Sequence, residues 1–225
     1  MKVLVACEES QAVTKEFRKL GHTAFSCDLI PCSGGHPEWH IQGDVLTLLN
    51  GNCKFYTQSH NKYKITGKWD LIIAFPPCTY ITNAGACRLF KYKDGKRYIN
   101  KMRYLKGLQG KEFFMEFINA DCDKIAVENP VPTKIYNLPP YTQIIQPYEY
   151  GHPYSKRTCL WLKNLPPLYP TNVLTENIIS WVSGGSKTSD GKPRINKGTT
   201  FRDSLTKSKT FTGIAKAMAE QWKEE

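Results

Sequence analysis

The sequence predicts an α/β protein built on a doubly wound, mostly parallel sheet. Short apolar segments rich in β-branched residues alternate with segments of helical periodicity, as in repeated β-α-β units. The run 71–75, "LIIAF", is apolar at every position, which is typical of a strand covered on both faces. A hydrophobic content of 40% in 225 residues suffices for one core, so we expect a single domain spanning residues 1–225.

The first β-α-β unit is predicted in the N-terminal 29 residues. Residues 2–7, "KVLVAC", form an apolar strand-like run. Residues 8–21 follow with apolar side chains at helical spacing and a glycine at the end, which predicts a helix and its stop. Residues 22–29, "HTAFSCDL", are predicted to be the second strand.

The later elements continue this alternation. A Gly- and Pro-containing loop leads to an extended segment at 40–45, and a polar stretch at 50–68 precedes the apolar strand. Apolar residues spaced by three and four predict helices at 104–119 and at the C-terminus. Further strands are predicted at residues 124–129, 142–148 and 157–162.

The net charge of +11 is concentrated in two segments, which we interpret as basic loop insertions. Residues 88–111 hold nine Lys and Arg against one acid, and residues 183–210 hold seven against two. Such segments are typical of contact with a phosphate backbone, although a solvated lysine-rich loop has the same composition. The first also carries aromatic residues suited to stacking on bases: Phe90, Tyr92, Tyr98 and Tyr104.

Composition also limits the cellular context. No apolar run approaches the roughly 18 residues that a membrane span needs, and the N-terminus lacks the features of a secretory signal. We therefore expect a soluble, cytoplasmic protein with no membrane partner. Its eight cysteines are scattered without C-x-x-C pairs, so they are expected to be free thiols.

One cysteine follows a stiff turn at the end of the buried strand. Pro76 and Pro77 restrict the backbone, and Cys78 comes directly after them. In open α/β sheets, the carboxyl edge of the strands is where ligands bind. Cys78 is therefore a candidate nucleophile, the alternative being a buried structural cysteine.

Three acids end other predicted strands and are candidates for the same crevice. Asp28 ends the second strand, where nucleotide-binding folds place a carboxylate against ribose hydroxyls. Asp44 ends another extended segment and could accept from an adenine amino group. Glu128, in "VENP", could handle protons beside Cys78. Taken singly, each acid is better explained as a helix cap or a surface group; their shared position at strand ends favours the functional role.

A competing constellation could in principle close around zinc. Cys27, Cys32, His36 and His40 have the spacing C-x4-C-x3-H-x3-H, which does not fit a common structural zinc module. Cys27 directly precedes Asp28 on a strand better explained by a nucleotide site. We therefore expect no metal.

The ordered motifs resemble those of DNA cytosine-5 methyltransferases, in the short form often found in phages and prophages. The resemblance rests on "PPCT" after an apolar strand, "VENP" about fifty residues later, "EYGHPYSKRT" before another strand, and the terminal "TFTGIAKAMA". It spans nearly the whole chain and implies the Rossmann-like fold of methyltransferases that depend on S-adenosylmethionine.

The resemblance also implies a mechanism. Cys78 would attack carbon 6 of cytosine, Glu128 would hydrogen-bond ring nitrogen 3 and the exocyclic amine, and the target base would be flipped out of the duplex. The implied contacts to S-adenosylmethionine are Ala6, Cys7, Glu8, Ser10, Gln11, Asp28, Leu29, Asp44, Val45, Pro76 and Thr212. The implied contacts to DNA are Asn129, Lys156, Arg157, Lys192, Arg194 and Lys197.

The chain departs from the family pattern in ways that keep other functions open. The glycine-rich first loop of the family is here "ACEESQ", and too few residues separate strand 157–162 from the terminal motif to hold a target-recognition domain. We therefore expect a short or degenerate DNA target. The same chemistry on a free pyrimidine nucleotide, or a DNA-binding protein without catalysis, are the alternatives. The oligomeric state is left open.

Overall fold

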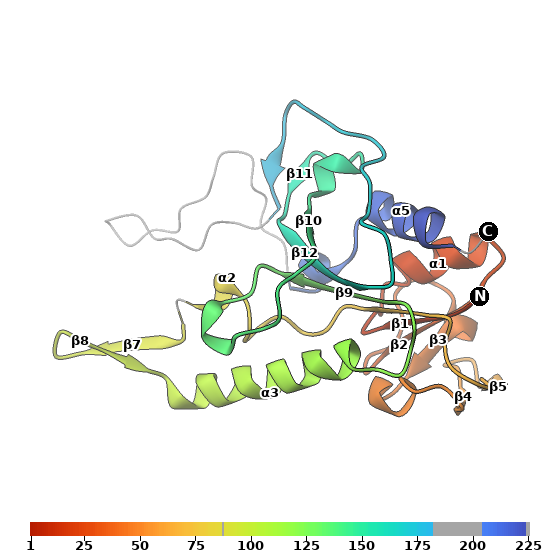
Figure 1. Cartoon of the computed structure of the whole chain (residues 1–225), viewed down its shortest axis with the longest axis horizontal. Helices are drawn as coiled ribbons and strands as arrows, with labels where there is room; N and C mark the ends of the chain where they lie inside the picture. The colour runs from red at the N-terminus through yellow and green to blue at the C-terminus, as the bar shows by residue number, and fades with distance from the viewer. Residues whose placement is uncertain (87, 182–203, 224–225) are drawn as a thin grey trace.

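A computed structural model describes residues 1–86, 88–181 and 204–223, and a seven-stranded sheet forms its centre (Figure 1). Across the sheet, the strands are β10 (Gln143–Ile145), β12 (Thr158–Lys163), β9 (Ile125–Pro130), β6 (Leu71–Ala74), β1 (Lys2–Ala6), β2 (Thr23–Asp28) and β3 (His40–Gln42). Each lies within or beside a segment that the sequence predicts to be extended.

The sheet is parallel except around one strand. β9, β6, β1, β2 and β3 pair in parallel, whereas β12 is antiparallel to both β9 and β10. Numbered along the chain, the seven strands have the order 3-2-1-4-5-7-6. This is the Rossmann order 3-2-1-4-5-6 with one reversed strand inserted near the edge. The predicted α/β class and the Rossmann-like sheet are therefore confirmed.

Helices cover both faces of this sheet. α1 (Ala12–Lys19) and α5 (Thr212–Trp222) pack on one face, and α3 (Lys101–Ile118) lies on the other (Figure 1). Alternate residues of one strand enter opposite cores, since Leu71 packs with the first pair of helices and Ile72 packs toward α3. A strand with two buried faces has no polar position, which explains the unbroken apolar run in the sequence.

The helices differ from the prediction at their N-termini. α1 begins only at Ala12, because residues 7–11 form a turn in which Cys7 and Gln11 have φ of 57° and 56°. α3 begins at Lys101, earlier than predicted, because Asn100 caps it by accepting a hydrogen bond from the N–H of Arg103 (3.3 Å).

Two hairpins extend beyond the central sheet. The polar stretch 50–68 contains β4 (Lys54–Tyr56) and β5 (Lys62–Lys64), which pair antiparallel. β7 (Phe90–Lys93) and β8 (Lys96–Ile99) pair within the first basic segment and project from the body at the far end of α3 (Figure 1). The other short elements are α2 (Asn83–Ala86), β11 (Tyr154–Ser155), β13 (Ile179–Ser180) and α4 (Ser204–Ser208).

Within the ranges described above, no helix combines the length and the apolar character needed to cross a membrane. The seven described cysteines all carry free thiols, as the sequence predicts.

Candidate active site

The candidate residues gather at the edge of the sheet where the parallel strands end. Asp28 ends β2, Glu128 lies near the end of β9, and Cys78 follows β6 after the two prolines. β6 and β9 are neighbours, with Ala74 opposite Val127. The segments that carry Cys78 and Glu128 therefore leave the sheet side by side.

Cys78 and Glu128 influence each other electrostatically. The Cys78 thiol is partly buried, and burial raises its pKa; the negative charge of Glu128 raises it further. The ammonium group of Lys156 acts in the opposite direction and lowers the pKa of Cys78. A thiol, a carboxylate and an ammonium group from three separate parts of the chain thus share one environment.

Glu128 is held in a setting suited to proton transfer. Burial raises the pKa of its carboxyl group, whereas the charge of Lys156 and the hydroxyl of Thr158 lower it. A carboxyl group in which these influences oppose each other can change its protonation state when a ligand alters the balance.

Lys156 is positioned by contacts at both ends of the residue. Its backbone N–H donates to Oε1 of Gln146 (2.9 Å), and its Nζ donates to the backbone carbonyl of Lys207 (3.1 Å). Gln146 directly follows β10, the edge strand of the sheet, so its hydrogen bond attaches the loop that carries Lys156 to the end of that strand. The prediction assigned Lys156 to DNA, and the structure places it beside both candidate catalytic groups.

A narrow pocket opens directly on Glu128. It holds space for little more than a water molecule, because the chain that leads into α5 lies across it. Its lining residues are Phe75, Glu128, Lys156, Thr158, Ser208, Thr210, Phe211, Ile214 and Met218. Cys78 is not part of this lining, so the thiol lies outside the narrow part of the site.

The buried side chain of Asn129 links β9 to the turn that follows β6. Its side chain is 1% exposed, and its Nδ2 donates to the carbonyl of Pro76 (2.9 Å). Its Oδ1 is buried with no hydrogen-bond partner in the described part of the chain. The turn that presents Cys78 is therefore fixed to the strand that presents Glu128, whereas the sequence suggested a DNA contact for Asn129.

The other half of the edge carries the two aspartates. Burial, and then the charge of Asp28, Cys27 and Asp44, raise the pKa of the Cys7 thiol. Asp28 and Asp44 therefore both lie near Cys7, which follows the end of β1. Asp28 is partly buried, and its Oδ1 accepts from the N–H of Ile30 (3.2 Å). Asp44 is exposed and caps the 3-10 helix Val45–Thr47, because its Oδ1 accepts from the N–H of Leu46 (3.0 Å).

The turn between β1 and α1 is held by its own side chains. The carboxylate of Glu8 accepts from the N–H groups of Val13 (2.6 Å) and Thr14 (3.2 Å) and from the Thr14 hydroxyl (2.7 Å). The Gln11 side chain accepts from the N–H of His36 (3.0 Å) and donates to its carbonyl (2.8 Å). The side chains of Glu8 and Gln11 are thus occupied, and a cofactor contact from this turn would come from its backbone.

The remaining predicted cofactor residues lie in different surroundings. Ala6, Val45 and Pro76 are buried, whereas Leu29 is 73% exposed. Ser10 is partly buried, and the exposed Thr212 hydroxyl lies 3.4 Å from Nε2 of His152. Their roles remain predictions.

The predicted DNA contacts beyond Asn129 and Lys156 are less well defined. Arg157 is exposed next to Lys156. Lys192, Arg194 and Lys197 lie outside the described residues.

The zinc alternative has no support in the described ranges, where no group of three or more metal-ligating side chains occurs. The ring of His40 instead lies between the hydroxyl of Ser26 (2.9 Å) and the carbonyl of Ile30 (2.9 Å). The Cys27 thiol contacts the carbonyl of Gly43 (3.5 Å).

Comparison with known proteins gives distant structural likenesses. No protein-family model and no curated protein matches the chain. A solved structure from E. coli, provisionally described as a DNA modification methyltransferase encoded within a prophage, is similar with a TM-score of 0.43 and 14% identity. The match covers 77% of this chain and 52% of the solved chain, so this chain spans about half the length of that protein.

Three contributors to the site were not predicted. Thr158 contacts Glu128, Gln146 positions Lys156, and Arg103 donates to the carbonyl of Thr79 (2.9 Å), one residue after Cys78. Gln146 and Arg103 have no sequence signal, because they depend on how separate elements meet. Thr158 begins the strand next to Glu128 and could have been found from that position.

Proposed function

We propose that the protein is an S-adenosylmethionine-dependent methyltransferase that modifies carbon 5 of cytosine in DNA. The observation that carries this proposal is the convergence of Cys78, Glu128 and Lys156 at the ends of β6, β9 and β12. A nucleophile with an acid and a cation beside it is the set of groups that addition to a pyrimidine ring requires. The resemblance in motif order supports the same chemistry.

The cofactor site fits the groups that S-adenosylmethionine offers. Its ribose hydroxyls and adenine amine are donors, and Asp28 and Asp44 supply carboxylate acceptors at adjoining strand ends. The exposed Leu29 and Leu46, 73% and 37% accessible, could cover an adenine ring. When bound, S-adenosylmethionine would supply an electrophilic methyl group.

Cys78 would act as the nucleophile. Its thiolate would form a bond to carbon 6 of the cytosine, and the electron pair displaced from the double bond would make carbon 5 nucleophilic. After methylation, loss of the proton from carbon 5 would restore the double bond and break the bond to sulfur. Lys156 would favour the reactive thiolate, since its charge lowers the pKa of Cys78.

Glu128 would couple base binding to activation of the thiol. In its protonated form it can donate a hydrogen bond to ring nitrogen 3, while Lys156 and Thr158 stabilise the ionised form. Protonation of Glu128 also removes a negative charge that raises the pKa of Cys78. A base that favours the protonated acid would therefore also favour the thiolate.

DNA is the substrate that the charge distribution favours. Cytosine inside a duplex cannot reach a site recessed at a sheet edge, so the base would have to be flipped out. The pocket is too narrow for a pyrimidine ring as it stands, so the chain at Ser208–Phe211 would have to move when the base enters. The basic residues would hold the DNA backbone.

The second candidate is the same reaction on a free pyrimidine nucleotide. It is favoured by the short chain between β12 and α5, which leaves little room for a recognition domain. The projecting basic hairpin is not needed for a nucleotide and favours DNA. Cys78 and Glu128 at one site argue against a protein without catalysis.

Mass analysis of nucleosides tests the proposal. Mixed-sequence DNA is incubated with the protein and S-adenosylmethionine, digested, and compared with DNA treated with the Cys78→Ala variant. We expect 5-methylcytosine from the wild type alone. Methylation at an exocyclic nitrogen, or equal amounts from both proteins, would contradict the proposal, and methylated free nucleotides with unmodified DNA would support the second candidate.

A further inference from the structure

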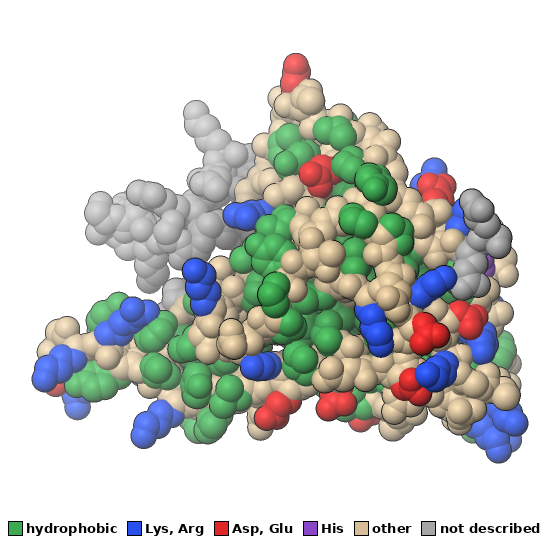
Figure 2. Space-filling model, viewed as in Figure 1, with side chains coloured by type: hydrophobic (Ala, Val, Ile, Leu, Met, Phe, Trp, Pro, Cys, Tyr) green, Lys and Arg blue, Asp and Glu red, His purple; other side chains and the backbone are tan. Residues whose placement is uncertain are grey.

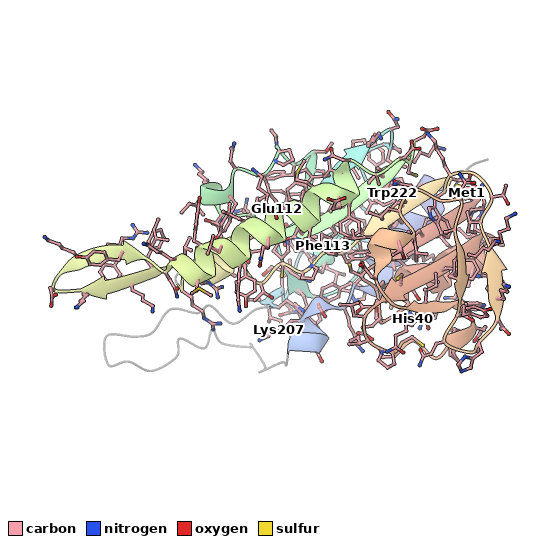
Figure 3. All side chains as sticks on the ribbon, turned by 90° about the horizontal axis from the view of Figure 1, so that it is seen from below. Met1, His40, Glu112, Phe113, Lys207 and Trp222 are labelled. Atoms are coloured by element: carbon pink, nitrogen blue, oxygen red, sulfur yellow. The ribbon has the colours of Figure 1, made fainter. Side chains whose placement is uncertain are left out.

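The β7–β8 hairpin projects from the body with a defined register. Lys91 lies opposite Tyr98, and Lys93 lies opposite Lys96. Asp94 and Gly95 close the hairpin with φ of 50° and 70°, which is the two-residue turn whose twist matches a hairpin. Figure 3 shows that the hairpin runs directly into α3.

The two faces of this hairpin differ in chemistry. Residues opposite each other in an antiparallel pair share a face, so one face carries Lys91, Lys93, Lys96 and Tyr98, all of them exposed. We call this set the basic face. The other face carries Phe90, Tyr92, Arg97 and Ile99, and there the guanidinium of Arg97 lies 3.5 Å from the centre of the Phe90 ring.

The base of the hairpin is anchored next to the candidate nucleophile. Leu89 is 2% exposed, and its carbonyl accepts from the N–H of Asn100 (2.8 Å) at the start of α3. Arg103 lies three residues after Asn100, and its guanidinium donates a hydrogen bond to the carbonyl of Thr79, the residue after Cys78. The same guanidinium lies 4.9 Å from the centre of the Tyr80 ring. The hydrogen bonds of Asn100 and Arg103 therefore place the base of the hairpin close to the loop that carries Cys78.

The size and charge of the hairpin match a groove of duplex DNA. The backbones of two paired strands lie about 4.8 Å apart, so the ribbon is narrower than the major groove. The major groove is about 12 Å wide and admits a two-stranded ribbon. Lys and Arg side chains gather toward the projecting end (Figure 2), and Asp94 is the one acid between Arg88 and Ile99 in the sequence.

We propose that the β7–β8 hairpin binds in the major groove of duplex DNA beside the target base, with the basic face toward the DNA. The three lysines contact phosphates and base edges, and Tyr98 lies against the bases between them. The inference rests on the proposed function, since it assigns to this hairpin the contact that a separate recognition domain would otherwise make.

The chain contains a matched control for this surface. On the β4–β5 hairpin, Lys54 lies opposite Lys64 and Tyr56 lies opposite Lys62, so three lysines and one tyrosine again share an exposed face. This second hairpin lies at the opposite end of the molecule (Figure 1). Replacing the three lysines of either hairpin with neutral residues therefore removes three positive charges from an exposed hairpin face.

The test compares the triple variants K91Q/K93Q/K96Q and K54Q/K62Q/K64Q with the wild type. Binding to a mixed-sequence 30-base-pair duplex, of roughly three helical turns, is measured without cofactor across a range of salt concentrations. Each lost phosphate contact lowers the slope of log affinity against log salt by about 0.9, so the first variant should lose up to about 2.7. The second variant should keep the wild-type slope, and both should keep the wild-type melting temperature.

Dimethyl sulfate footprinting identifies the groove. Guanine N7 faces the major groove, so the wild type should protect guanines that K91Q/K93Q/K96Q leaves reactive. Tyr98→Ala should weaken binding several-fold while the salt slope stays unchanged, because it removes no charge.

Three results would overturn the inference: equal loss of slope in both triple variants, binding without protection at N7, or no duplex binding by the wild type. Methylation of DNA is assayed on the same proteins. If the wild type methylates DNA and the hairpin variant binds it normally, only the inference fails; if DNA is bound but not methylated, the proposed function fails.

Discussion

The amide of Asn129 donates a 2.9 Å hydrogen bond to the carbonyl of Pro76, across the boundary between β9 and the turn that ends β6. Glu128 precedes Asn129, and Cys78 lies two residues after Pro76. One buried side chain therefore sets the relative position of the proposed acid and the proposed nucleophile.

Asn129→Asp tests this positioning role with almost no change in shape. The ionised aspartate cannot donate to the buried Pro76 carbonyl and adds an unpaired buried charge, so the free energy of unfolding should fall by at least about 1–3 kcal/mol. We expect kcat to fall more than the affinity for DNA, because the geometry of the reacting groups is disturbed. Urea unfolding and methyl-transfer kinetics measure both, with the exposed Asn61→Asp as the control. Equal losses in kcat and DNA affinity would instead indicate a direct DNA contact.

Glu128→Gln keeps the shape of the side chain but cannot donate a proton from a carboxyl group. We expect turnover to fall by roughly two or more orders of magnitude, as when a transition-state contact is lost. Glu112→Gln, exposed on α3, should leave the rate unchanged. Steady-state methyl transfer measures both, and a wild-type rate in Glu128→Gln would remove this residue from the mechanism.

The charge of Lys156 should affect the pH dependence of methyl transfer. Its charge lowers the pKa of Cys78, so Lys156→Met should raise that pKa, and the rising limb of the rate should move to higher pH. Lys156→Arg keeps the charge and should keep the limb near its original position. Single-turnover rates as a function of pH measure this, and identical profiles for the Met and Arg variants would show that the charge has no role in activation.

The buried Glu8 should make the protein less stable as the pH rises. Burial raises its pKa from 4.5 to about 7, so the folded protein holds a proton between these values that the unfolded chain releases. Its contribution to stability is thus fully present below pH 4.5 and is lost as the pH rises through 7, by up to roughly 3 kcal/mol. Urea unfolding at pH 5 and pH 8 should show a smaller decrease in Glu8→Gln than in the wild type. An equal decrease in both proteins would assign the pH dependence to other groups.

The sheet was predictable because its signals are local. The apolar run at 71–75 is typical of a strand with two covered faces. Cys78 follows that strand and Glu128 lies near the end of the neighbouring one, and the carboxyl ends of neighbouring parallel strands meet at one edge of a sheet. Proximity of these two residues therefore follows from topology alone.

The parts that were not predicted depend on contacts between separate segments. The Glu8 carboxylate accepts hydrogen bonds from the first N–H groups of α1, and the helix therefore begins at Ala12 rather than at Glu8. Lys156 is positioned near Cys78 by its hydrogen bonds to Gln146 and Lys207, which lie in other segments. The β7–β8 hairpin did have a local signal, the Asp-Gly pair at 94–95, which is typical of a two-residue hairpin turn.

Covalent trapping tests the central claim most directly. On a duplex that contains 5-fluorocytosine, carbon 5 has no proton to lose after methylation, so the bond between Cys78 and carbon 6 should persist. With S-adenosylmethionine present, the wild type and the control Cys32→Ala should form an adduct that survives denaturation, and Cys78→Ala should form none. An adduct in Cys78→Ala, or none in the wild type on a duplex that it methylates, would contradict nucleophilic attack by Cys78.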